Sequence, residues 1–176
     1  MHESLAPMLG PILGRRSIRA YQAREVSADV VTALLEAAMA APSAVARDPW
    51  RFLVLRSREV REKVAEGLPH GKMLGSAGVG FVVAGELAAA HDGQLSYLLQ
   101  DCSAAIENLL LAAHALGLGA VWLGVHPREP RIQHLRRVLS SPESVLPIAC
   151  IAAGYPAEQK VARTRFNARY VHYDRW

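Results

Sequence analysis

Residues 101–124, DCSAAIENLLLAAHALGLGAVWLG, decide the fold because a long helical pattern passes here into a buried strand. The helical pattern spans residues 95–116, about 22 residues or roughly 33 Å of helix. Its first half is amphipathic, whereas residues 109–116 are apolar almost all round apart from His114. Such a surface must be covered on every side, by the rest of the domain or by a partner subunit. A strand is predicted directly after it, over residues 120–125.

The rest of the chain repeats this alternation of helices and buried strands. Apolar stripes at helical spacing predict three further helices, at residues 27–41, 58–67 and 130–139. Short apolar runs between breakers predict three further strands, at residues 50–56, 79–85 and 146–153. Helices that alternate with buried strands predict a layered αβ domain. After Pro156 the chain is polar, basic and nearly free of aliphatic periodicity, so this tail either frays or lies along another surface.

Length and composition favour one soluble domain without a metal or nucleic-acid site. The chain has 176 residues, 51% hydrophobic and 20% charged, which suits one folded domain over residues 1–176. Its two cysteines exclude a disulfide framework and a four-cysteine zinc site, and its histidines lack ligand spacing. The net charge of +4 is too small to demand nucleic acid. We expect a cytoplasmic protein without a membrane span, because residues 1–4 open no signal peptide and glycines interrupt the apolar segment 104–125.

Basic residues gather near both ends of the chain. One group is Arg15, Arg16, Arg19 and Arg24, and the other is Lys160, Arg163, Arg165, Arg169 and Arg175. If the two ends meet in the fold, these groups would form one anion site. In an extended segment, Arg15, Ser17 and Arg19 share one face while Ile18 turns to the core. Two guanidiniums and a hydroxyl on one face suit a phosphate, and a solvated basic turn is the alternative for so short a motif.

No side chains in the sequence pair a nucleophile with a base. The glycines of residues 117–124 leave a helix rather than open one, and those of residues 75–80 precede a strand, so neither segment matches a dinucleotide-binding turn. Residues 41–50, APSAVARDPW, place small side chains between a helix and a strand, where the backbone either approaches a flat ligand or forms a plain loop. If the protein is an enzyme, we therefore expect a cofactor to carry the chemistry.

Four motifs resemble, in their order and spacing, the FMN-dependent nitroreductase family. They are RRSIRAY from residue 15, APSAVARDPWRFLVL from residue 41, the segment 101–124, and GYPAE from residue 154 with RTR soon after it. The resemblance implies an α+β fold, a three-layer αβα sandwich with a mixed, mainly antiparallel central sheet. It also implies a homodimer with intertwined termini and two FMN sites at the interface, with NADH or NADPH as the reductant.

The resemblance further implies roles for individual residues. The FMN phosphate would be bound by Arg15, Arg16, Ser17, Arg19, Arg163 and Arg165. The other subunit would line the flavin with Pro42, Ser43 and Ala44. The isoalloxazine would lie against Trp122, Leu123 and Gly124, with a backbone N–H of Gly124 or Val125 bonded to flavin N5. The pyrimidine edge of the flavin would lie near Lys72.

The implied activity passes reducing equivalents from NAD(P)H through flavin to a small-molecule acceptor, such as a nitroaromatic or a quinone, by a ping-pong mechanism. Ala46 and Asp48 stand where the family usually has asparagine and glutamine, which puts the substrate range in question. One alternative is reductive dehalogenation or flavin-driven oxidation on the same fold, although the connection between Leu87 and Gln94 is short for a lid. Another is a flavin-binding protein without turnover.

Overall fold

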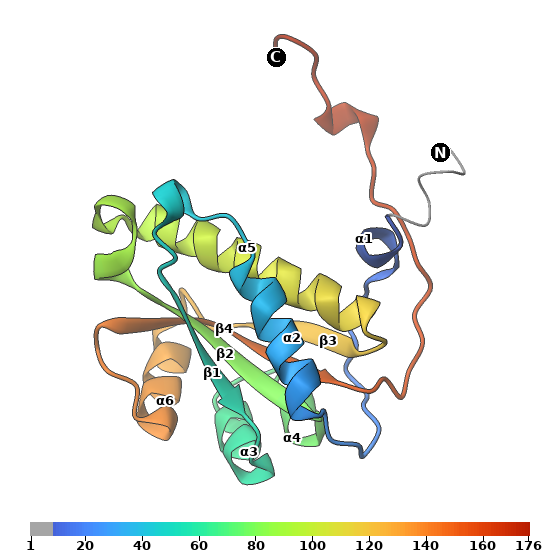
Figure 1. Cartoon of the computed structure of the whole chain (residues 1–176), viewed down its shortest axis with the longest axis vertical. Coiled ribbons are helices and arrows are strands. Elements are labelled where there is room, and N and C mark those ends of the chain that lie inside the picture. Colours follow the sequence, from blue (N-terminus) through green and yellow to red (C-terminus); the bar gives the residue numbers. More distant parts are fainter. Residues whose placement is uncertain (1–8) are drawn as a thin grey trace.

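The central sheet consists of four antiparallel strands in the order β1-β2-β4-β3 (Figure 1). The strands are β1 (Trp50–Leu55), β2 (Val79–Glu86), β3 (Gly119–Gly124) and β4 (Val145–Gly154). β1 and β3 are therefore its two edges, and one parallel bridge joins Ser17 to Ala120 at the outer edge of β3. This computed structural model describes residues 9–176, so the prediction about residues 1–4 lies outside the described residues.

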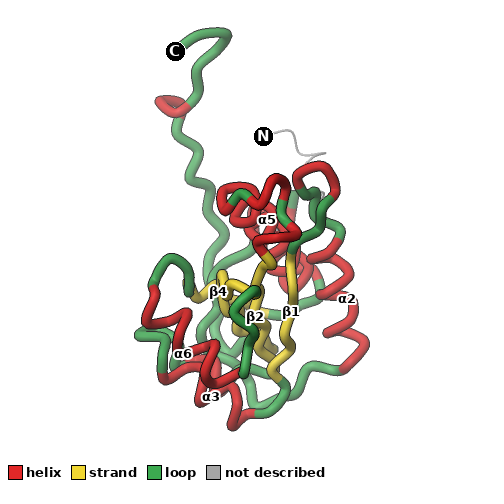
Figure 2. Tube along the Cα trace, turned by 90° about the vertical axis from the view of Figure 1, so that its left-hand side faces the viewer, coloured by secondary structure: helices red, strands yellow, loops and turns green. Residues whose placement is uncertain are grey.

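Helices cover both faces of this sheet (Figures 1 and 2). On one side lie α1 (Gly10–Gly14), α2 (Ala28–Met39) and α5 (Leu95–Ala115). On the other side lie α3 (Arg58–Glu66), α4 (Met73–Ser76) and α6 (Glu129–Leu139). The layers confirm the predicted α+β sandwich, and each predicted helix and strand is present with its ends within two residues of the prediction. Serine hydroxyls cap two of the helices, because Ser27 accepts from the N–H of Val30 and Ser57 from that of Val60.

Alternate side chains of the two central strands enter separate hydrophobic cores. Phe81 and Ile151 pack toward α2 and α5, whereas Val82 and Cys150 pack toward α3 and α6. Because both faces of β2 and β4 are buried, their sequences are nearly continuous apolar runs. Burial also raises the pKa of the Cys150 thiol to about 12, so this side chain serves packing.

The second half of α5 is only partly covered by its own chain. Leu109, Leu110 and Ala113 are buried, but His114 is exposed and Leu116 is 48% exposed. The rest of the domain therefore does not wrap this half on every side. The sequence predicts that the rest of the domain or a partner subunit covers this surface. Burial by a partner subunit stays a prediction.

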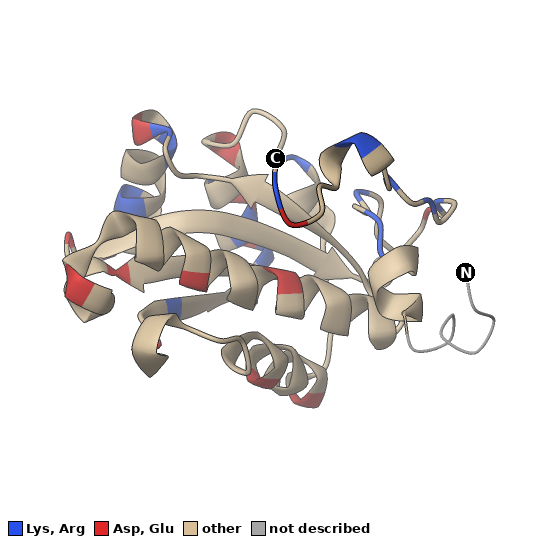
Figure 3. Cartoon of the chain, turned by 90° about the horizontal axis from the view of Figure 1, so that it is seen from above, with Lys and Arg blue, Asp and Glu red and all other residues tan. Residues whose placement is uncertain are grey.

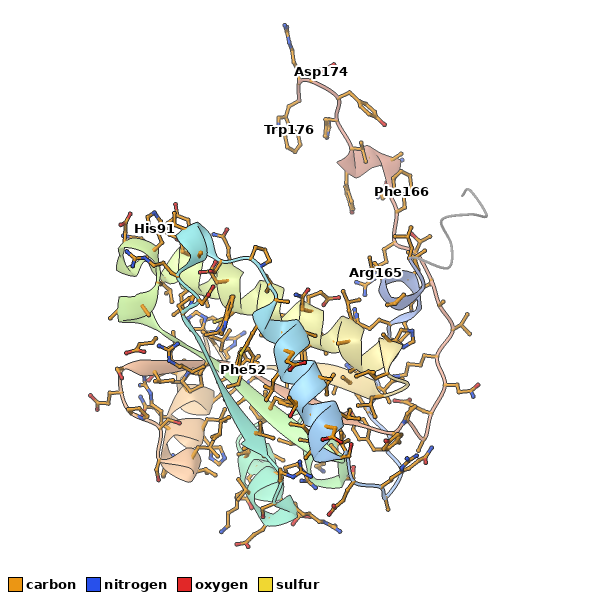
Figure 4. The ribbon with its side chains drawn as sticks, viewed as in Figure 1. Phe52, His91, Arg165, Phe166, Asp174 and Trp176 are labelled. Atoms are coloured by element: carbon orange, nitrogen blue, oxygen red, sulfur yellow. The ribbon has the colours of Figure 1, made fainter. Side chains whose placement is uncertain are left out.

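The chain after Pro156 leaves the body as an extended arm (Figure 1). Its aromatic side chains stand in solvent, with Phe166 76% and Trp176 fully exposed (Figure 4). Lys and Arg residues recur along the same arm (Figure 3). At its base the arm contacts the N-terminal segment, because Tyr21 forms a bridge with Pro156 and the N–H of Ala157 donates to the carbonyl of Ala20 at 2.8 Å. The two basic segments of the sequence therefore start side by side.

Candidate functional site

The outer edge of β3 is the frame of the candidate site. The N–H of Ile18 donates to the carbonyl of Ala120 at 3.1 Å, so residues 17–18 run along this edge, and Ile18 is buried as predicted. At the other end of β3, the N–H of Val125 donates inward to the carbonyl of Ile148 at 3.2 Å. Backbone groups alternate along an antiparallel ladder, so the N–H and the carbonyl of Gly124 point outward from the sheet. Of the two donors considered for flavin N5, Gly124 is the one that faces outward.

A cavity of about 600 Å³ opens beside this edge. Its apolar wall consists of Leu68, Pro69, Met73, Trp122 and Leu123, and its basic wall consists of Arg19, His70, Lys72 and Arg131. A Cβ built on Gly124, which also lines the cavity, meets no atom within 4 Å, so any side chain here would take up ligand space. The volume lies within the roughly 300–1,000 Å³ typical of small-molecule sites, and a flat apolar wall beside basic groups suits an aromatic anion.

The structure brings together five of the predicted site residues. The same cavity is lined by Arg19, Lys72, Trp122, Leu123 and Gly124, although Arg19 and Lys72 come from segments far apart in the sequence. The guanidinium of Arg19 forms no hydrogen bond or ion pair with residues 9–176 and is exposed. It is therefore available to a ligand.

Arg15 and Arg16 instead line a second cavity of about 320 Å³. Arg15 pairs with Glu107 at 3.2 Å between Nε and Oε1. Arg16 holds the arm, because its Nε donates to the carbonyl of Val161 at 3.0 Å and its Nη2 donates to the carbonyl of Arg163 at 2.6 Å. Its guanidinium thus fastens the two ends of the chain to each other.

Glu158 and Lys160 fix the backbone around Ser17. The carboxylate of Glu158 accepts hydrogen bonds from the N–H groups of Arg19 and Ala20 and pairs with Lys160 at 3.2 Å. Lys160 also donates to the carbonyl of Ser17 at 2.6 Å. The N–H of Arg19 is the main reason that the pKa of Glu158 is lowered. These contacts hold the arginine–serine segment extended along the cavity.

Arg163 and Arg165 are exposed residues of the arm and do not line the 600 Å³ cavity. Figure 4 shows Arg165 near the start of the arm. The loop residues Pro42, Ser43 and Ala44 do not line that cavity either. Within one chain, these five predicted residues are therefore not among the five that line it.

The proline–serine loop has its own hydrogen-bond system. The hydroxyl of Ser43 bonds to the Asp48 carboxylate and accepts from the N–H of Asp48 at 3.0 Å. The buried carboxylate of Asp101 on α5 accepts the N–H of Ala44 at 3.0 Å through Oδ1. Ala46 lies in the left-handed region with φ 54°. Side-chain hydrogen bonds thus fix the conformation of this loop.

The described residues show no metal set and no membrane helix. No group of three or more His, Cys, Asp or Glu side chains within residues 9–176 is placed to hold an ion. No helix in the same range is long and apolar enough to span a bilayer.

Comparison with known proteins decides the family. A model of the Nitroreductase family matches residues 12–68 and 66–155. The chain belongs to the nitroreductase family. A curated nitroreductase relative from Methanothermobacter thermautotrophicus, provisionally named NADH dehydrogenase/NAD(P)H nitroreductase, is 45% identical over 169 residues, which are 96% of this chain and 87% of that protein.

Solved structures of nitroreductase relatives agree. A crystal structure from Parabacteroides distasonis with the same provisional name has a TM-score of 0.90 and 37% identity, covering 97% of this chain and 99% of the other. A structure from Desulfovibrio desulfuricans, described provisionally as a nitroreductase in complex with FMN, has a TM-score of 0.82 and 34% identity, covering 97% and 98%. The predicted family and fold are both confirmed.

Five residues of the cavity were missed by the sequence reasoning, namely Leu68, Pro69, His70, Met73 and Arg131. His70 and Met73 lie at or beside the turn between α3 and α4, where no periodic pattern marks an inward side chain. Arg131 lies on α6, whose charged residues resemble a solvated face. Nothing in the sequence indicates that this guanidinium reaches back to β3.

Proposed function

We propose that this nitroreductase-family protein is an FMN-dependent oxidoreductase, which passes reducing equivalents from NADH or NADPH to a nitroaromatic, quinone or similar acceptor by a ping-pong mechanism. The observation that carries the proposal is the 600 Å³ cavity, in which a basic wall and an apolar wall meet beside the outward N–H of Gly124. The relative described in complex with FMN, 34% identical over nearly all of this chain, supports the same cofactor.

The residues of the cavity fit FMN. The flat apolar wall and the open space above Gly124 would accept the isoalloxazine, with the outward N–H of Gly124 toward flavin N5. Arg19, with Ser17 two residues before it, would bind the phosphate, and Lys72 would lie near the pyrimidine edge, whereas Arg15 lines the second cavity and pairs with Glu107. Bound FMN supplies hydride transfer, and the chain positions it, keeps water from one ring face and stabilises charge beside it.

We also infer that the protein is a homodimer. The exposed aromatic arm and the uncovered end of α5 leave more apolar surface than a stable monomer usually shows. A second copy would bring its Pro42–Ala44 segment and an arm with Arg163 and Arg165 to the cavity, which would add these five predicted residues to those already there. We place this dimer in the cytoplasm.

The alternatives are less well supported. Only two short 3-10 turns, Leu87–Ala89 and His91–Gly93, fill the connection where a lid would be inserted, which disfavours a dehalogenase or oxidase. A flavin-binding protein without turnover would consume no NAD(P)H in the steady state.

The deciding experiment is a visible spectrum of the purified protein before and after anaerobic addition of NADH or NADPH. We expect a yellow FMN protein that is bleached by the reductant and recoloured by an acceptor. A colourless protein that cannot be reconstituted with FMN would end the proposal.

A further inference from the structure

Arg131 is fixed at the edge of the cavity by a contact that uses only part of its guanidinium. Its Nη1 donates to the outward carbonyl of Gly124 at 2.7 Å. The structure gives its other N–H groups no partner among residues 9–176, and the residue is partly buried in the cavity wall. A guanidinium has five N–H donors in a rigid plane, so one hydrogen bond orients the remaining ones.

The surroundings leave the charge of Arg131 uncompensated. No Asp or Glu side chain of residues 9–176 lines the cavity, and three of its other residues, Arg19, His70 and Lys72, are basic. The nearby acid on α6, Glu129, accepts a hydrogen bond from Gln133 and does not line the cavity. Apolar neighbours such as Trp122 and Leu123 reduce screening by water, which strengthens any charge-assisted contact.

The contacts assigned to FMN use Arg19 and Lys72 and leave Arg131 free. Its anchor is the carbonyl of Gly124, the same residue whose N–H would face flavin N5, so Arg131 would lie beside the part of the ring at which a reactant must arrive. A planar donor group at that position matches a carboxylate or a phosphate oxygen pair.

We propose that Arg131 binds an anionic group, carboxylate or phosphate, on the molecule that enters the cavity beside the flavin. The protein is then selective for anionic over neutral reactants. This inference rests on the proposed function and names the substrate class of the same site. The anion has two possible sources, the acceptor and the pyrophosphate of NAD(P)H, and the experiment separates them.

The test compares wild type with Arg131→Gln and Arg131→Lys, all loaded with FMN. One pair of acceptors is 4-nitrobenzoate and neutral 4-nitrobenzamide, and one pair of hydride donors is NADH and neutral 1-benzyl-1,4-dihydronicotinamide. For each pair the anionic-to-neutral ratio of kcat/KM is compared between variants, so intrinsic reactivity cancels. We expect Arg131→Gln to lower the ratio of at least one pair about tenfold or more, and Arg131→Lys to restore part of it. The pair that responds identifies the source of the anion.

A binding measurement complements the kinetics. Benzoate and benzamide, which do not react, are titrated into the oxidised holoprotein while the flavin absorbance is followed, and only benzoate should lose affinity in Arg131→Gln. Arg137→Gln, an exposed arginine of α6 outside the cavity, is the matched control and should change neither ratio.

Two results would overturn the proposal while leaving the FMN function standing. One is an unchanged ratio for both pairs in Arg131→Gln. The other is a variant whose main defect is a weakened Kd for FMN and riboflavin alike, which would place the guanidinium on the flavin itself. If the wild type binds no FMN, the proposed function fails instead.

Discussion

Arg19 and Arg16 belong to one sequence motif, but the structure predicts different consequences of removing them. The guanidinium of Arg19 has no partner within residues 9–176, so Arg19→Ala should change the free energy of unfolding of the apoprotein by less than about 0.5 kcal/mol. Losing a charged donor to the FMN phosphate should cost about 1.5–3 kcal/mol of binding, roughly 10- to 150-fold in Kd. Riboflavin, which lacks the phosphate, should bind Arg19→Ala as it binds the wild type.

Arg16 should behave otherwise, because its guanidinium donates to the carbonyls of Val161 and Arg163 and holds the arm. Arg16→Ala should weaken FMN and riboflavin together and lower stability by about 0.5–1.5 kcal/mol, since the exposed arm loses the hydrogen bonds that fasten it to the N-terminal segment. Calorimetric titration of the apoproteins with both ligands at one ionic strength measures the four affinities. Equal losses of FMN and riboflavin in Arg19→Ala would refute the assignment of Arg19 to the phosphate, and a phosphate-specific loss in Arg16→Ala would refute the structural role of Arg16.

Further predictions concern the cavity, the acid response, the arm and the loop. Gly124→Val should reduce FMN affinity at least about tenfold, because the new side chain enters the space of the ligand. The midpoint temperature of unfolding of the apoprotein should stay unchanged or rise, because a strand accepts β-branched residues. Because the pKa of Glu158 is lowered, its contacts persist above that pKa and are lost as pH falls through it. In a pH titration of FMN binding, the affinity of the wild type should therefore fall in this acid range. Glu158→Gln should show no such fall in affinity. Deleting residues 166–176 should shift light scattering from dimer to monomer. Ala46→Asn should raise the denaturant-derived free energy of unfolding by about 1 kcal/mol, since asparagine tolerates left-handed backbone better than alanine does.

Periodicity predicted the regular elements because burial is what creates it. The apolar runs over β2 and β4 are readable since both faces of these strands are buried, and α2 begins where Ser27 can cap it. By contrast, α1 and α4 are one-turn helices set by tertiary contacts, and neither has a stripe long enough to show in the sequence.

Charge patterns predicted which segments meet but not what each side chain does there. The basic ends do lie together at the base of the arm, yet Arg16 binds backbone carbonyls while Arg19 faces the cavity. Both are arginines of one short extended segment, and only the path of the arm decides between the roles. In the same way, Arg131 is indistinguishable in sequence from the exposed Arg137 of α6 until β3 is placed beside it.

The proline–serine loop shows how the two departures from the family pattern are accommodated. Ala46 has a left-handed backbone conformation. The asparagine that the family usually has at this position would favour that conformation, because its short polar side chain tolerates it. In this chain, hydrogen bonds from other residues stabilise the conformation instead. The buried Asp101 carboxylate accepts from the N–H of Ala44, and the Ser43 hydroxyl bonds to both the carboxylate and the N–H of Asp48. The negative charge of Asp48 is thereby engaged within its own loop rather than directed at a ligand. The loop conformation in this chain thus rests on these contacts rather than on an asparagine at position 46.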